Sequence, residues 1–226
     1  MATATPLTSA ETARVEDYFF FEDAGWELYD RIDAWAGDRS GFRLVYLDGD
    51  LEVMAKSRHH DFMTFRLHEL VTALANASGV VWEDAGAATF RERALDAGTQ
   101  GDQTYYFGEN AARMTGVKKI EPGEHPVPDL AIEIQIANPV KHALGAWSRL
   151  GVREVWHLNA SGLELKLVVL RLRDDGSGYD PTSRSDYLPI SDVQLLELLK
   201  LLSSEGAQDW GLQLPRRLAE ILGQAG

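Results

Sequence analysis

The chain of 226 residues contains no cysteine, which excludes disulfides, thiolate catalysis and zinc sites built on cysteine. It also has no apolar run long enough to cross a bilayer. Its first residues, MATATPLTSAETARVEDY, lack the apolar core of a signal peptide. Together these absences predict a soluble, cytoplasmic protein with no membrane partner.

Positive charge is scarce as well. The 22 lysines and arginines are outnumbered by 35 aspartates and glutamates, which gives a formal net charge of −13. A broad cationic surface is therefore excluded, and a polyanionic substrate would need metal ions or a local basic patch. A hydrophobic share of 45% is enough for one substantial core.

The most informative stretch covers 126–159, PVPDLAIEIQIANPVKHALGAWSRLGVREVWHLN. Apolar residues alternate over 130–136, which predicts a strand, and helical spacing follows over 140–150 up to Gly151. A second apolar run, 152–158, predicts another strand. Glu133 lies in the middle of the first strand, where a buried carboxylate is costly unless a partner or a metal neutralises it.

The rest of the chain predicts a mixture of helices and strands. Asp48-Gly49 is typical of a hairpin turn and divides 42–54 into two strands. The other expected elements are one or two helices over 15–35, a helix over 58–77, short strands over 80–82 and 87–91, a glycine-rich loop over 96–101, strands over 103–107 and 163–172, a loop over 174–185, an edge segment over 187–189, and helices over 192–203 and 214–222. We therefore expect one α+β domain over 14–226, with helical ends and a flexible tail over 1–13.

Asp102 directly precedes the aromatic strand 103–107. If Asp102 and Glu133 lie on adjacent strand ends, their oxygens can bind Mg²⁺ or Mn²⁺ and leave positions for water and a phosphate. Such an ion would lower the pKa of the attacking water and neutralise charge on the phosphate oxygens. The alternative is structural: Asp102 caps a turn, and Glu133 pairs with Arg149 or Arg153.

A lysine normally completes a site of this kind, two positions after the glutamate. That position holds Gln135, whose amide can hydrogen-bond water but supplies no positive charge. His59, His60 and Asp61 lie in the first turn of the helix expected over 58–77. They could contribute to a metal site, but neighbouring histidines at a helix start are more often solvated.

Several motifs occur in a recognisable order: DGDLEVM, His60-Asp61, ATFRER, GDQTYYFG, PDLAIEI and WSRLGVREVWHL. In this order, the stretch 43–156 resembles the restriction endonuclease family often called Uma-two, a branch of the PD-(D/E)XK nuclease superfamily. The resemblance implies a restriction-endonuclease-like core, a mixed β-sheet flanked by helices, here with helical N- and C-terminal additions. It also implies that the chain cleaves DNA with Mg²⁺ or Mn²⁺ as cofactor.

Carried over to this chain, the resemblance makes Asp102 and Glu133 the metal ligands. Gln135 and Lys141, the nearest lysine on the following helix, become the residues that position water. The supporting residues are Glu52, His60 and Asp61. Gly101 stands where relatives carry proline, a change expected to be harmless because that residue positions backbone only.

A competing hypothesis is a degenerate member of the family that keeps the fold and binds nucleic acid or a protein partner without cutting. The absence of a lysine at position 135 and the negative net charge favour this hypothesis, whereas the presence of Asp102 and Glu133 favours the nuclease. Aromatic residues over 18–35 could also supply the surface of a homodimer.

Overall fold

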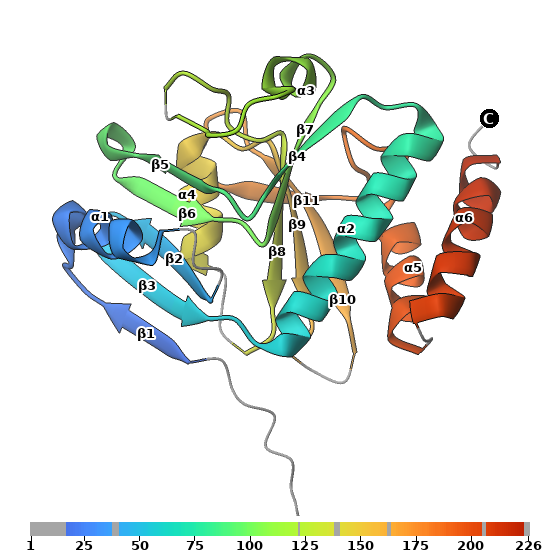
Figure 1. Ribbon diagram of the computed structural model, residues 1–226, viewed down its shortest axis with the longest axis horizontal. Coiled ribbons are helices and arrows are strands. Elements are labelled where there is room, and N and C mark those ends of the chain that lie inside the picture. The colour runs from blue at the N-terminus through green and yellow to red at the C-terminus, as the bar shows by residue number, and fades with distance from the viewer. Residues whose placement is uncertain are drawn as a thin grey trace, which may run out of the picture.

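The computed structural model describes residues 17–37, 41–121, 123–137, 141–161, 164–204 and 207–223. Within these ranges the protein is α+β, with six α-helices and two β-sheets (Figure 1). The flexible tail expected over 1–13 lies outside the described residues. In the described ranges no helix combines the length and apolar character needed to cross a bilayer.

The first sheet has five strands, all antiparallel. Their order is β1 (Tyr18–Phe21), β3 (Asp50–Ala55), β2 (Phe42–Leu47), β6 (Ala97–Gln100) and β5 (Thr89–Glu92). The β2–β3 hairpin is confirmed, and its turn residues Asp48 and Gly49 have positive φ values of 51° and 93°. Two expectations are wrong: β1 is a strand rather than part of a helix, and the glycine-rich loop contains strand β6. Both strands form because each pairs with a strand from elsewhere in the chain.

The second sheet has six strands and is mixed. Their order is β11 (Tyr179–Thr182), β10 (Lys166–Leu172), β9 (Glu154–Asn159), β8 (Leu130–Gln135), β7 (Gln103–Phe107) and β4 (Trp82–Gly86). Strands β8 and β9 are parallel and flank helix α4 (Lys141–Leu150), which confirms the expected strand-helix-strand unit. The loop expected over 174–185 instead contains β11, and the edge segment expected over 187–189 forms no strand.

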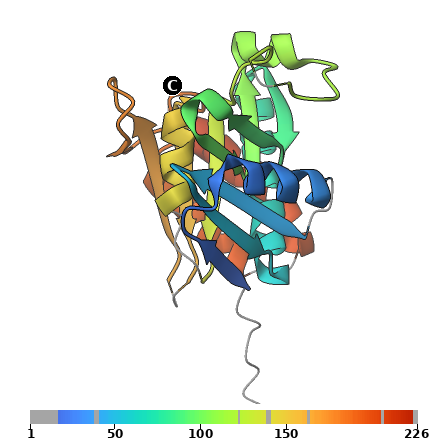
Figure 2. The same ribbon diagram turned by 90° about the vertical axis from the view of Figure 1, so that its left-hand side faces the viewer.

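The elements form layers. Helix α4 lies between the two sheets, and α1 (Gly25–Ala36) covers the outer face of the five-stranded sheet (Figures 1 and 2). Helices α2 (Arg58–Ser78), α5 (Asp192–Ser204) and α6 (Ala207–Gly223) cover the far face of the six-stranded sheet. The short helices η1 (Arg93–Leu95) and α3 (Gly108–Met114) complete the described elements. The C-terminal addition is helical as expected, whereas the N-terminal one combines strand β1 with helix α1.

Strand alternation decides which side chains point into the space between the sheets. On β8, Leu130, Ile132 and Ile134 join the core beneath α2, so Ala131 and Glu133 face α4 and the other sheet. On β2, Leu44 and Tyr46 pack beneath α1. Arg43 therefore points inward from the opposite layer, toward Glu133.

Candidate active site

Asp102 and Glu133 are brought together by the pairing of β7 with β8. Gln103 lies opposite Ile132 in the register. The backbone N–H of Asp102 donates to the carbonyl of Ile132 at 3.1 Å, and the N–H of Ile134 donates to Oδ2 of Asp102 at 2.7 Å. Both carboxylates are buried. The expected proximity of the two acids is therefore present.

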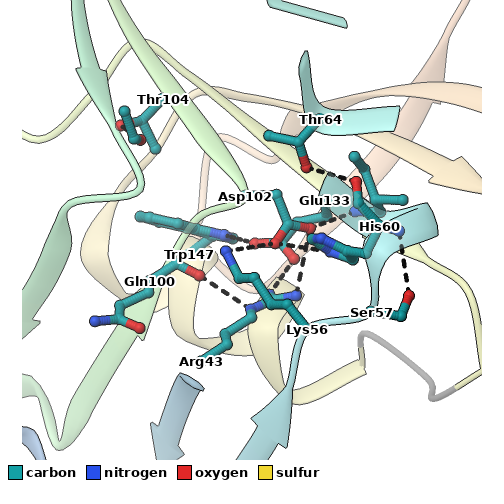
Figure 3. Close-up of polar contacts among 12 residues, drawn as sticks. Arg43, Lys56, Ser57, His60, Thr64, Gln100, Asp102, Thr104, Glu133 and Trp147 are labelled. Carbon is teal, nitrogen blue, oxygen red and sulfur yellow. Dashed lines mark hydrogen bonds and ion pairs between the residues drawn. The ribbon is translucent and has the colours of Figure 1, made fainter. Parts of the chain in front are cut away.

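Arg43 lies between the two carboxylates (Figure 3). Its Nη2 donates to Oε2 of Glu133, and its Nη1 lies 3.6 Å from Oδ2 of Asp102. Its Nε donates to the carbonyl of Gln100 at 3.0 Å. The side chain is 1% exposed, so a permanently charged guanidinium is buried with the two acids.

The second oxygen of Glu133 is held by a tryptophan on α4. Nε1 of Trp147 donates to Oε1 of Glu133 at 2.6 Å. The indole also packs beside Gly101, because a Cβ placed there would lie 3.2 Å from Cζ2 of Trp147 and 2.7 Å from Cγ2 of Thr104. A residue with a Cβ at position 101 would therefore require Thr104 or Trp147 to shift.

The electrostatics of the two acids differ. Burial raises the pKa of Glu133 to about 7, with Asp102 adding to the increase and Arg43 opposing it. Burial would also raise the pKa of Asp102, but Arg43, His60 and Lys56 outweigh it and hold that pKa well below its usual value. Burial acts to lower the pKa of Arg43, and the neighbouring carboxylates reverse this and raise it.

Lys56 and His60 complete the cluster around Asp102. Nζ of Lys56 lies 3.4 Å, and Nε2 of His60 3.0 Å, from Oδ1 of Asp102. Ser57 caps the start of α2 and its hydroxyl accepts the N–H of His60, which places Lys56 and His60 beside Asp102. The expectation of a solvated His60 is wrong, because the side chain is buried.

The lysine of the site therefore differs from the sequence-based choice. Lys141 is exposed at the start of α4 and takes part in none of the ion pairs found in the described ranges. Lys56 is 11% exposed and lies next to Asp102. In the sequence, Lys56 lies between the predicted hairpin and the serine that caps the next helix. This position does not reveal which acidic residue the lysine side chain contacts.

The remaining candidates lie around this centre. Gln135 ends β8, and its Oε1 contacts Nε2 of His157 at 3.2 Å. Glu52 is buried on β3, where it accepts the hydroxyl of Tyr18 at 2.8 Å and pairs with Nδ1 of His142. Asp61 and His59 are both exposed.

The structural alternative, in which Glu133 pairs with Arg149 or Arg153, names the wrong arginine. Arg149 pairs with Asp48 at 3.1 Å, and the cation bound to Glu133 is Arg43, from a strand 90 positions earlier. Arg43, Lys56 and Trp147 are therefore the site residues that sequence reasoning missed.

Lys56 and Asp102, but not Glu133 or Arg43, line a pocket of about 430 Å³. Lys56, Asp61, Thr64, Gln100 and Asp102 are among its lining residues. A ligand in the pocket would meet Lys56 first and Asp102 behind it. Asp61 keeps a place at the site as a residue of the pocket wall.

The donor set fits a hard divalent cation. Two carboxylates supply oxygen, and Oδ1 of Asp102 accepts no well-aligned hydrogen bond within the described residues, although Lys56 and His60 lie close. The described ranges contain no cluster of three acidic, histidine or cysteine side chains arranged for a metal. Mg²⁺ commonly binds through one or two carboxylates and completes its shell with water and substrate phosphate, so Asp102 and Glu133 suffice in number once Arg43 or Trp147 releases an oxygen of Glu133.

In comparisons with known proteins, no family model matches the chain and no curated protein matches it. The resemblance to the Uma-two family therefore stays a prediction.

Proposed function

We propose that this chain is an endonuclease that uses Mg²⁺ or Mn²⁺ to hydrolyse phosphodiester bonds in DNA, on a restriction-endonuclease-like core. The observation that supports this best is the pair Lys56 and Asp102, 3.4 Å apart on the wall of one pocket, with the buried carboxylate of Glu133 on the adjacent strand β8. The parallel β8–α4–β9 unit within a mixed sheet is the structural context that the resemblance implies for such a site.

Each residue then has a defined task. Asp102 and Glu133 would hold the cation, which when bound lowers the pKa of water and neutralises charge on the phosphate. Lys56, at the pocket, orients water or stabilises charge that develops on the phosphate oxygens. Nε2 of His60 lies 3.0 Å from Oδ1 of Asp102 on the side of the protein interior, and the N–H of Ile134 donates to Oδ2.

The proposed substrate and setting follow the same reasoning. With a net charge of −13 the protein offers no broad attraction to DNA, so contacts near Lys56 and the bound cation must supply it. We place the reaction in the cytoplasm. A homodimer is part of the proposal, because Phe19, Phe21 and Trp35 are 57%, 42% and 64% exposed on β1 and α1.

Plasmid nicking tests the proposal. Purified wild type with Mn²⁺ should convert supercoiled plasmid to nicked circles, and Asp102→Asn and Lys56→Met should each reduce the rate by a factor of about 100 or more. Lys166→Met, which removes an exposed lysine at the start of β10, is the matched control and should cleave normally.

Two outcomes would count against these assignments. Nicking that persists in Asp102→Asn would show that the activity lies elsewhere or comes from a contaminant. Loss of nicking in Lys141→Met but not in Lys56→Met would restore the lysine chosen from the sequence.

A second candidate function is a non-catalytic protein that binds nucleic acid or a protein partner. The position of Arg43 favours it, because Arg43 and Lys56 already balance the charge of two ionised carboxylates without a metal. Absence of Mn²⁺ binding, together with retained DNA binding, would support this candidate and contradict the nuclease.

A further inference from the structure

Arg43 occupies the position from which a cation could contact both carboxylates. Its two terminal nitrogens face Glu133 and Asp102 (Figure 3). A divalent ion placed between the same carboxylates would be a close neighbour of this guanidinium in a buried site, where repulsion between like charges is strong. Arg43 and the ion therefore compete for the same two acids.

Glu133 can bind an ion only if one of its oxygens is released. Oε1 is held by Trp147, which is fully buried and packs against Phe90 with ring centroids 5.7 Å apart. Its helix α4 lies between two sheets, so the indole has little room to move. Oε2 is held by Arg43, whose side chain has more rotamers available than an indole and is anchored elsewhere by one hydrogen bond, from Nε to the carbonyl of Gln100.

Arg43 has a second acid within its own sheet. Val45 lies opposite Glu52 in the β2–β3 register, so Arg43, two positions earlier, is a diagonal neighbour of Glu52 on the same face. Glu52 is buried and already contacts His142 and Tyr18. Nη1 of Arg43 makes no well-aligned hydrogen bond in the described residues, so a shift toward Glu52 would improve its pairing.

We propose that Arg43 is a positioning residue that sets the affinity of the site for its cation. In the cation-free protein it holds Glu133, and on cation binding it leaves Oε2 of Glu133 and turns toward Glu52. The proposal rests on the proposed metal-dependent function. Glu52 is not one of the two proposed metal ligands. Its role in this proposal is to pair with the guanidinium of Arg43 after the cation displaces it from Glu133.

Calorimetric titration with Mn²⁺ in the absence of DNA tests this directly. Arg43→Met removes the charge but keeps much of the apolar stem, and should bind Mn²⁺ on the order of tenfold more tightly than wild type. Glu52→Gln removes the charge of the second acid and should bind more weakly than wild type. Arg43→Met/Asp102→Asn should lose binding, which locates the ion at this site.

The outcomes separate the inference from the function on which it rests. If wild type binds Mn²⁺ and folded Arg43→Met binds equally or more weakly, the role of Arg43 is overturned and the nuclease proposal stands. If neither wild type nor folded Arg43→Met binds Mn²⁺, the metal-dependent function itself fails. Circular dichroism decides which variants are folded; if Arg43→Met is not, Glu52→Gln decides, and unchanged affinity in that variant overturns the inference.

Discussion

Glu133 is a buried carboxylate with a structural role, to which the proposed function adds that of a metal ligand. Its two oxygens face different partners, a guanidinium from the opposite sheet and an indole from α4. Leaving such an acid without partners would be strongly destabilising. The same partners hold both oxygens in fixed directions, so one of these partners must leave before Glu133 can bind a cation.

The pH dependence of stability should report on Glu133. Burial raises its folded pKa to about 7, above the usual 4.5, so the folded state binds the proton more tightly than the unfolded state. The resulting stabilisation is complete below pH 4.5 and is lost as pH rises to about 7. Glu133→Gln cannot titrate and lacks this change.

We therefore expect the stability difference, wild type minus Glu133→Gln, to fall over this range, by on the order of 1.4 kcal/mol per unit of pKa shift. Urea unfolding of both proteins from pH 4.5 to about 7 measures it. Asp102 should not interfere, because its lowered pKa affects stability only below about 3.8. A difference that stays constant with pH would contradict the raised pKa of Glu133.

Strand β6 lies so close to helix α1 that one of its positions requires glycine. It was expected to be a loop because of its glycines, yet it pairs with both β2 and β5. A Cβ at Gly98 would overlap the hydroxyl of Tyr29 and lie 2.8 Å from its Cε1. Glycine here lets helix α1 pack closely against the sheet.

Gly98→Ala should therefore destabilise the protein by about 1–3 kcal/mol, because the buried ring of Tyr29 must move. Gly41→Ala is the matched control, since a Cβ at Gly41 meets no atom within 4 Å, and should change stability by less than about 0.5 kcal/mol. Denaturant unfolding of both variants makes the comparison. Equal effects would show that Tyr29 adjusts without cost.

At the level of the complete molecule, one edge of the five-stranded sheet exposes large apolar side chains. Strand β1 is an edge strand that presents exposed phenylalanines. Edge strands with apolar side chains are prone to pair with another chain. This supports the proposed homodimer.

Light scattering after size exclusion should give twice the 25.1 kDa mass of one chain. Phe19→Asp, on β1, should shift the protein to monomer by placing a charge in an apolar interface. Phe65→Asp, on α2, is a matched control because Phe65 is also 57% exposed, and should remain dimeric. A monomeric wild type would remove the homodimer from the proposal.

The amino-acid sequence by itself determined the elements whose signals are local. The β2–β3 hairpin followed from Asp48-Gly49, α2 from its serine cap, and the β8–α4–β9 unit from a change in hydrophobic period. The proximity of Asp102 and Glu133 was one of two alternatives that the sequence offered, since Asp102 directly precedes one predicted strand and Glu133 lies within another.

Only the tertiary structure decided which cations meet those acids. Arg43 contacts Glu133 across the space between the two sheets, and the two residues are 90 positions apart in the sequence. Lys56, and not Lys141, lies beside Asp102. Strands β1 and β6 were missed for the same reason, since each pairs with a strand distant in the sequence. Strand β11 pairs with the preceding strand β10 and was missed because its Gly/Ser/Asp-rich segment favours a loop. Periodicity reports which face of an element is buried, but the partner across a layer depends on how the layers stack, and no local pattern carries that information.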